Sequence, residues 1–141
     1  MANEINLRTS LSIRKGALQF QSFPQSFTAT MLGSGGPTPG YLTVATTPGT
    51  DVSLAQLVGP GGMAFLVNLD PTNFVTYGIH DAVTHEFYPL GEIQPNEAYA
   101  IRTSRHLGNR YTDVGTGVGG PTLRFVADTA ACKIAVYAFD A

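Results

Sequence analysis

The sequence predicts an all-β protein, a jelly-roll-like β-sandwich of about eight short strands with no long helix. Three observations support this fold class. Apolar and polar residues alternate with a period of two along much of the chain, and Gly, Pro, Asn and Asp separate the runs at close spacing. No window of a dozen residues has the 3.6-residue apolar period of a helix. For this number of strands, two sheets in a jelly roll are the expected architecture.

The first forty residues contain two strand patterns and a breaker. Apolar side chains of one parity over residues 5–13 predict a half-buried strand that ends at Lys15. A second alternating run covers residues 23–31, and Pro24 places its start toward a sheet edge. Residues 33–40, GSGGPTPG, are too rich in Gly and Pro for a helix or a central strand and predict a loop or short tether.

The remaining strands are separated by strong turn sequences, DPTN at 70–73 and QPN at 94–96. Residues 41–46 and 51–58 fit either short strands or a turn of helix. Further strands are predicted around residues 63–69, 75–79, 87–90, 99–101, 123–127 and 133–139. We therefore expect one domain over residues 1–141, with an N-terminal strand or arm over about 1–15 and a long irregular loop over about 102–121.

Composition favours a protein that works while docked to other proteins. Of the 141 residues, 43% are apolar and only 13% are charged, against about 25% charged in average domains. Net charge keeps protein copies apart, so a weakly charged surface suits self-association. A weakly charged monomer is the alternative.

Charge is also unevenly distributed along the chain. All eight basic residues lie in the two end segments, whereas residues 16–101 contain none and hold six acidic residues. Such a chain can present one acidic face and one basic edge, which favours head-to-tail or ring contacts between identical copies. We expect a homo-oligomer, with a trimer favoured. Because no basic run is interleaved with aromatic residues, nucleic acid is not an expected partner.

The sequence gives no sign of secretion or of a membrane segment. Cys132 is the only cysteine, so no disulfide can form within the chain, and its apolar neighbours predict a buried, inert thiol. The first ten residues lack the basic and apolar regions of a signal peptide, and no apolar run is long enough to span a bilayer. We expect a protein made in a cytoplasm that stays soluble.

The candidate catalytic motifs lack the spacing or the partner residues that catalysis requires. The GTGVGG segment at 115–120 has the wrong spacing for a dinucleotide site and is followed by Pro121 rather than a helix. Ser104 and His106 are close in sequence, but no acid is placed to orient the imidazole. The prediction is a non-enzymatic protein without a cofactor.

A pair of histidines offers the strongest alternative chemistry. If residues 81–84 turn a hairpin, His80 and His85 face each other across it at a separation that suits a shared metal ion. A third ligand, His106 or a carboxylate, is not tied to the pair by the sequence. We therefore predict no metal, with two histidines at strand ends on a wet rim.

Carbohydrate binding is a second alternative. Five tyrosines could stack on sugars, although the chain has no Trp and most of these positions have the parity of core residues: Tyr41, Tyr77, Tyr88, Tyr99 and Tyr111. The acids Glu86, Glu92 and Glu97 lie near turns and give no assignable catalytic pair.

Basic residues at the two ends are the predicted protein interface. Arginine is favoured at interfaces because its planar guanidinium makes several directional hydrogen bonds. The candidates are Arg8, Arg14 and Lys15 in the N-terminal segment, and Arg102, Arg105, His106 and Arg110 in the irregular loop. A solvated loop is the alternative for the second group.

Three segments resemble small virion proteins of tailed bacteriophages. They are GMAFLVNLDPTNFVTYGI, with an NLD-x-TN turn after a strand, FYPLGEIQPNEAYAIR, with a hydrophobic-x-L-x-P-x-E turn, and the closing DTAACKIAVYAFD. They cover residues 62–101 and 128–140, about a third of the chain, and the N-terminal strand after MANE is also similar. The insert at 102–121 departs from the pattern.

The resemblance implies a structural rather than a catalytic role. It implies a β-sandwich that acts as a capsid decoration or cement protein on the outside of the head, with the major capsid protein or other virion proteins as partners. A tail, collar or fibre component is the alternative within the virion. A carbohydrate-binding module and a metal-dependent, cupin-like enzyme are alternatives of other classes.

Overall fold

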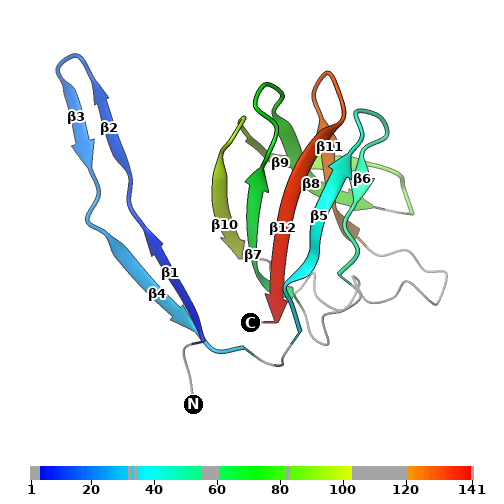
Figure 1. The fold of residues 1–141 in the computed structure, drawn as a ribbon, viewed down its shortest axis with the longest axis horizontal. Helices are drawn as coiled ribbons and strands as arrows, with labels where there is room; N and C mark the ends of the chain where they lie inside the picture. Colours follow the sequence, from blue (N-terminus) through cyan, green and yellow to red (C-terminus); the bar gives the residue numbers. More distant parts are fainter. Residues whose placement is uncertain are drawn as a thin grey trace. The chain divides into compact units, whose positions relative to one another are not determined.

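The computed structural model describes residues 4–31, 33, 35–54, 61–81, 83–102 and 121–140. Its contacts divide the chain into two compact units, residues 1–31 and 32–141. We call residues 4–31 the arm and the described residues from 35 onward the sandwich (Figure 1). The described residues contain strands and no helix, which confirms the predicted fold class.

The arm is one long β-ribbon made of two antiparallel ladders. Strand β1 (Ile5–Thr9) pairs with β4 (Gln25–Ala29), and β2 (Ser12–Lys15) pairs with β3 (Leu18–Gln21). Between the ladders, two residues of the outgoing chain lie opposite three of the returning chain, Ser22 to Pro24. The extra residue is a β-bulge, which bends a ribbon locally. Figure 1 shows the two ladders following one another along the ribbon.

Eight strands form the sandwich, the number predicted for the whole chain, and the four strands of the arm are additional to them. They are β5 (Thr38–Val44), β6 (Thr50–Asp51), β7 (Gly61–Asn68), β8 (Val75–Asp81), β9 (Phe87–Ile93), β10 (Ala98–Arg102), β11 (Pro121–Ala127) and β12 (Cys132–Asp140).

The strand order of the two sheets is that of a jelly roll. One sheet has the order β10-β7-β12-β5 and the other β6-β11-β8-β9, and every pair is antiparallel. The first of the eight strands pairs with the last, the second with the last but one, and so on inward to the β8–β9 hairpin. That nested pairing is produced by rolling up one long hairpin, and it closes two sheets over one core.

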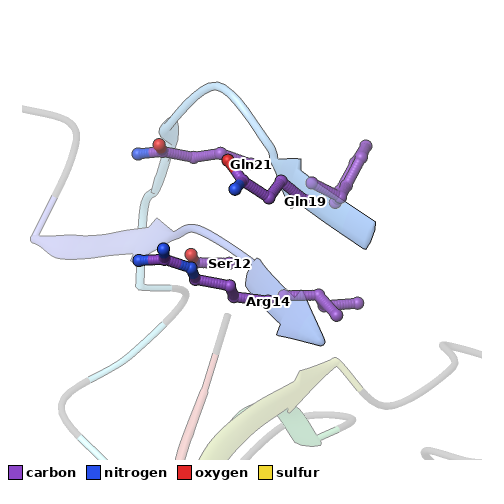
Figure 2. A pocket seen from close by; sticks show the side chains of 6 residues that line it. Ser12, Arg14, Gln19 and Gln21 are labelled. Carbon is purple, nitrogen blue, oxygen red and sulfur yellow. The ribbon is translucent and has the colours of Figure 1, made fainter. Parts of the chain in front are cut away.

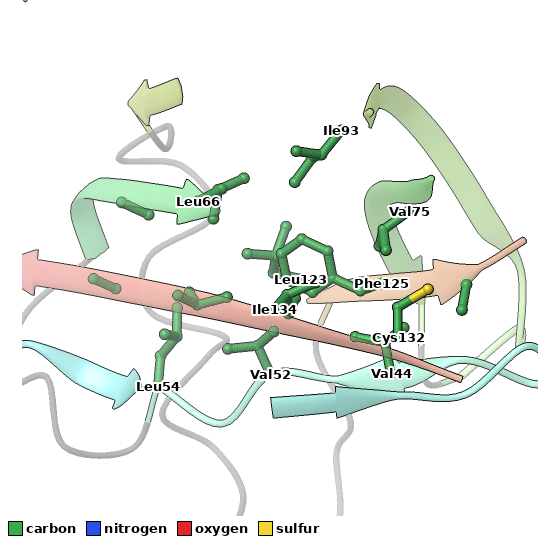
Figure 3. Close-up of a cluster of buried hydrophobic side chains, with 14 residues drawn as sticks. Val44, Val52, Leu54, Leu66, Val75, Ile93, Leu123, Phe125, Cys132 and Ile134 are labelled. Carbon is green, nitrogen blue, oxygen red and sulfur yellow. The ribbon is translucent and has the colours of Figure 1, made fainter. Parts of the chain in front are cut away.

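The core lies between the two sheets (Figure 3). Leu66, Ile134 and Val136 project from the first sheet toward Leu123 and Phe125 of the second. These side chains alternate along their strands, which is the pattern of a half-buried sheet.

Two strands of the first sheet are apolar on both faces. In β7, Ala64 and Leu66 enter the core, whereas Phe65 and Val67 project from the opposite face. In β12, Ile134 and Val136 belong to the core cluster, whereas Ala135 and Tyr137 lie on the opposite face, where Ala135 is only 1% exposed. Strands that are covered on both faces have this composition, so the outer face of this sheet differs from a solvated one.

Three features of the predicted organisation differ from the structure, and a fourth lies outside the described residues. The first unit extends to Met31 rather than to about residue 15, because residues 18–21 and 25–29 form its returning strands. The predicted N-terminal strand is present as β1 and β2, but only Ile5 and Leu7 of its apolar face are partly buried, whereas Leu11 and Ile13 are exposed. Thr38–Gly40, predicted as loop, begin β5, and Pro39 is tolerated there because β5 is an edge strand. Most of the predicted irregular loop, residues 103–120, lies outside the described residues.

Candidate interaction surfaces

The arm carries an apolar face in each of its ladders. In the β1–β4 ladder, Leu7 lies directly opposite Phe27, and in the β2–β3 ladder Ile13 lies opposite Phe20. Opposed residues of an antiparallel pair project on the same side, so each pair forms an apolar patch. Phe20 is 52% exposed, and Phe23 at the bulge is 86% exposed. The arm therefore presents large apolar side chains to its surroundings.

The other face of the arm is polar and basic. Ser12 lies opposite Gln21 and Arg14 opposite Gln19, and Figure 2 shows these four side chains on one side of the ribbon. They border a shallow depression, which a two-stranded ribbon cannot enclose. Arg8 lies on the corresponding polar side of the β1–β4 ladder, opposite Ser26. The predicted interface residues Arg8 and Arg14 are thus exposed on the polar face, whereas Lys15, also exposed, lies opposite Leu18 on the side of Ile13 and Phe20.

A ribbon of this kind has little stability of its own. An isolated two-stranded hairpin is at best marginally stable in water, because it buries little apolar surface. Exposed edges and apolar residues also make such a ribbon a template for pairing with other chains. Among the described residues, the arm is therefore a candidate surface for binding another protein.

The outer face of the β10-β7-β12-β5 sheet is a second apolar surface. Across the four strands, the register places one row of side chains as Ala100, Phe65, Tyr137 and Pro39, and the next row as Ala98, Val67, Ala135 and Tyr41. All eight are apolar or aromatic. Tyr41 is 75% exposed, Phe65 is 42% exposed, and the Tyr41 and Tyr137 rings pack edge to face at 6.5 Å. We call these eight residues the outer face.

Sequence patterning could have indicated the outer face. The runs MAFLV at 63–67 and IAVYAF at 134–139 are apolar at both parities. A strand with one solvated face alternates instead. The continuous apolar runs are therefore the signal for a second apolar face. The period-two spacing of Phe65 and Val67 does not by itself show which face of β7 enters the core.

The motifs behind the virion-protein resemblance meet at one end of the sandwich. Asn68, fully buried, donates through Nδ2 to the carbonyl oxygens of Asn73 (2.8 Å) and Ile93 (3.0 Å), and its Oδ1 accepts from the Asp70 backbone N–H. The Asp70 carboxylate accepts from the backbone N–H groups of Thr72 and Asn73, which lowers the pKa of Asp70. The NLD-x-TN motif is therefore a hydrogen-bonded turn.

The other two motif turns join the same network. The Asn96 backbone N–H donates to the Asp70 carbonyl oxygen, and Asn68 N–H donates to the Glu97 carbonyl oxygen. The Thr129 hydroxyl donates to Asn73 Oδ1 at 2.6 Å. Figure 1 shows the β7–β8, β9–β10 and β11–β12 turns at the same end of the sandwich. The three motif segments thus have one structural purpose, which is to tie these turns together.

A charged cluster joins β6 to the second sheet. Arg124 makes two hydrogen bonds to Asp51, Nε to Oδ1 at 2.6 Å and Nη2 to Oδ2 at 2.8 Å. Burial raises the pKa of Asp51, but the hydrogen bonds and positive charge of Arg124, with His80 nearby, outweigh it and hold that pKa below its usual 3.8. This bidentate pair anchors the two-residue strand β6 to β11.

Stability is expected to fall in acid partly through Asp51. Because its folded pKa lies below the unfolded value near 3.8, the pair stabilises the protein above that pH, and the contribution is lost as pH falls through the folded pKa. Asp51→Asn should lower the free energy of unfolding at pH 7 by about 1 kcal/mol. It should also reduce the fall of that free energy between neutral and acid pH. Urea unfolding between neutral and acid pH measures this. Asp128→Asn, a change at an exposed acid, is the control. An Asp51→Asn protein that loses as much unfolding free energy in acid as the wild type would contradict the assignment.

The histidine pair considered as a metal site is not assembled. The register places His80 opposite Phe87, while His85 lies in the turn with φ +61°. His80 is buried, with Nδ1 3.3 Å from Asp51 Oδ2 at an angle that makes no hydrogen bond, so its prediction as a rim residue is wrong. Among the described residues, no group of three or more His, Cys, Asp or Glu side chains could hold a metal ion.

Of the candidate tyrosines, two belong to the core. Tyr77 and Tyr99 pack against the buried cluster, edge to face with each other at 5.9 Å, as their parity predicted. Tyr41 and Tyr88 are exposed but lie on different sheets, and Tyr111 lies outside the described residues. The exposed tyrosines that the structure describes therefore form no shared platform for a sugar.

The remaining predicted site residues are located only in part. Arg102 is exposed at the end of β10, whereas Arg105, His106 and Arg110 lie outside the described residues. Cys132 is buried, as predicted, and burial raises the pKa of its thiol.

Comparisons with known proteins identify no relative. No family model, no curated protein and no solved structure matches the chain. In the part of the chain that the structure describes, no helix has the length and apolar character needed to cross a membrane.

Proposed function

We propose that this protein is a non-enzymatic structural component of a tailed-phage virion, acting as a decoration or cement protein on the outside of the capsid. The observation that carries the proposal is the arm, a 28-residue ribbon with exposed apolar patches and three basic side chains. The resemblance of the turn motifs to small virion proteins supports the virion setting. The major capsid protein is the proposed partner.

The mechanism is multivalent docking. Each copy contacts neighbouring subunits through its arm and its sandwich, and linked weak contacts gain avidity without any single strong contact. A shell cemented in this way resists outward pressure and needs no active site. The protein is made in the bacterial cytoplasm and acts on the assembled particle.

The proposal is tested by asking whether purified virions of the encoding phage contain this protein and where on the particle it lies. Mass spectrometry should find the protein in purified particles, and electron cryo-microscopy of particles lacking the gene should show density lost from the head surface. Density lost from the tail or collar would replace the decoration role with that alternative. Absence of the protein from purified particles would contradict the proposal.

A further inference from the structure

We infer that the outer face of one copy binds the apolar face of the arm of a second copy, so that the protein joins arm to sheet into a homo-oligomer. This inference rests on the proposed assembly function and names one partner for it, another copy of the same chain. The two surfaces are complementary in character, and both belong to this sequence.

The outer face has the shape and chemistry of a surface that another β-layer covers. Its eight side chains form two adjacent rows across four strands, and none carries a charge. β-layers pack face to face about 10 Å apart through such side chains. Contiguous exposed apolar side chains mark interaction sites in soluble proteins, and Tyr41 and Phe65 are the large exposed hydrophobic side chains of this face.

The arm offers the matching layer. Its exposed apolar side chains are three aliphatic residues and three phenylalanines: Leu11, Ile13, Leu18, Phe20, Phe23 and Phe27. Each aromatic side chain can bury roughly 150–250 Å², whereas a stable interface takes about 800 Å² from each partner. One arm laid on one outer face therefore supplies apolar area of the order that a specific contact needs.

Charge favours a second copy as the occupant. Residues 1–31 contain three basic residues and one acidic residue, a net charge of +2, and residues 32–141 contain five basic and nine acidic residues, a net charge of −4. The net charges therefore attract the arm of one copy to the sandwich of another, which accelerates their encounter. With its apolar face covered, the arm keeps Arg8 and Arg14 on the opposite face, in contact with water or acidic neighbours.

The contact joins two different surfaces, so it is head to tail. Such contacts close into a ring when the rotation between copies allows it and otherwise extend into a filament. A ring agrees with the trimer that the charge distribution favours.

Cross-linking between variants of the full chain that each carry one added cysteine tests the contact. Ile13→Cys places a thiol on the apolar face of the arm, and Phe65→Cys places one in the centre of the outer face. Mild oxidation of an equal mixture should give a dimer that contains one chain of each variant as the major product. Neither variant alone should give a comparable dimer, and the wild type, whose Cys132 is buried, should give none.

The matched control moves the arm thiol by one residue to the other face. Ser12→Cys, which lies opposite Gln21, should not cross-link to Phe65→Cys above background. Equal yields from Ser12→Cys and Ile13→Cys would overturn the inference, as would the absence of a mixed dimer or the formation of arm-to-arm dimers alone.

A double variant excludes the arm binding its own sandwich. Ile13→Cys/Phe65→Cys in an excess of wild-type protein should lose its cross-link if the contact is between copies. A cross-link that persists within one chain would overturn the inference. The outcome is separable from that of the virion test: a protein found in virions but not cross-linked contradicts only the arm-to-sheet contact, and a cross-linked protein absent from virions contradicts only the virion role.

Discussion

Asn68→Ala is expected to lower the free energy of unfolding by about 3 kcal/mol, because the change removes three buried hydrogen bonds to backbone groups, each worth about 0.5–1.5 kcal/mol. The Asn68 side chain is fully buried, and its Nδ2 donates to the Ile93 carbonyl oxygen on the other sheet. It also holds the Asn73 carbonyl oxygen and the Asp70 N–H of the β7–β8 turn. For a chain of this size, such a loss lowers the melting temperature by roughly 10 °C.

Two further variants sharpen this prediction. Asn68→Asp keeps the acceptor for the Asp70 N–H but turns a carboxylate toward two carbonyl oxygens, so it should be at least as damaging as alanine. Asn6→Ala makes the same amide deletion on the exposed arm and should change stability by no more than about 0.5 kcal/mol. Thermal and urea unfolding measure all three, and an Asn68→Ala protein as stable as the Asn6→Ala control would contradict the assigned role.

The fold class could be predicted because it depends on local patterns. Alternation and turn residues locate the strands around Phe65, Ile79 and Val136, and the DPTN and QPN turns appear where expected. Pairing between distant strands is not encoded locally. The returning strands of the arm, which include Phe20 and Phe27, therefore did not emerge as partners of the first.

Side-chain burial was harder to predict where both parities are apolar. Phe65 and Leu66 are neighbours of similar hydrophobicity, and only the position of the second sheet decides that Leu66 enters the core. His80 is a similar case. Its burial follows from the packing of β6 and β11 around Asp51, a residue 29 positions earlier in the chain. Patterns within a short window contain no information on such contacts.

The basic residues of the arm could be selected from the sequence, whereas the exposure of its apolar residues could not. Scarcity of basic residues identified Arg8, Arg14 and Lys15, and these lie exposed on the arm. The apolar side chains beside them were assigned to a half-buried strand. A strand pattern specifies that one face is apolar, but it does not specify which protein covers that face.

Ile13→Ser/Phe20→Ser should weaken self-association of the full chain by at least about a hundredfold. Burial of each such side chain contributes roughly 1.5–3 kcal/mol, and every 1.4 kcal/mol is about tenfold in Kd. The two residues are directly opposed in the β2–β3 ladder, so the variant removes one apolar patch without changing charge. Because both side chains are already exposed in the arm, the thermal unfolding of the sandwich should be unchanged.

Sedimentation velocity at tens of micromolar protein measures the effect, with Ser12→Ala/Gln21→Ala as the control. That variant alters the directly opposed pair on the polar face of the same ladder and should assemble like the wild type. Arg8→Ala/Arg14→Ala should weaken assembly at low salt and much less at high salt, since exposed charges are screened beyond about 8 Å at physiological ionic strength. A wild-type protein that stays monomeric, or an Ile13→Ser/Phe20→Ser protein that assembles as well as the polar-face control, would mean that the apolar face of the arm is not the surface through which copies join.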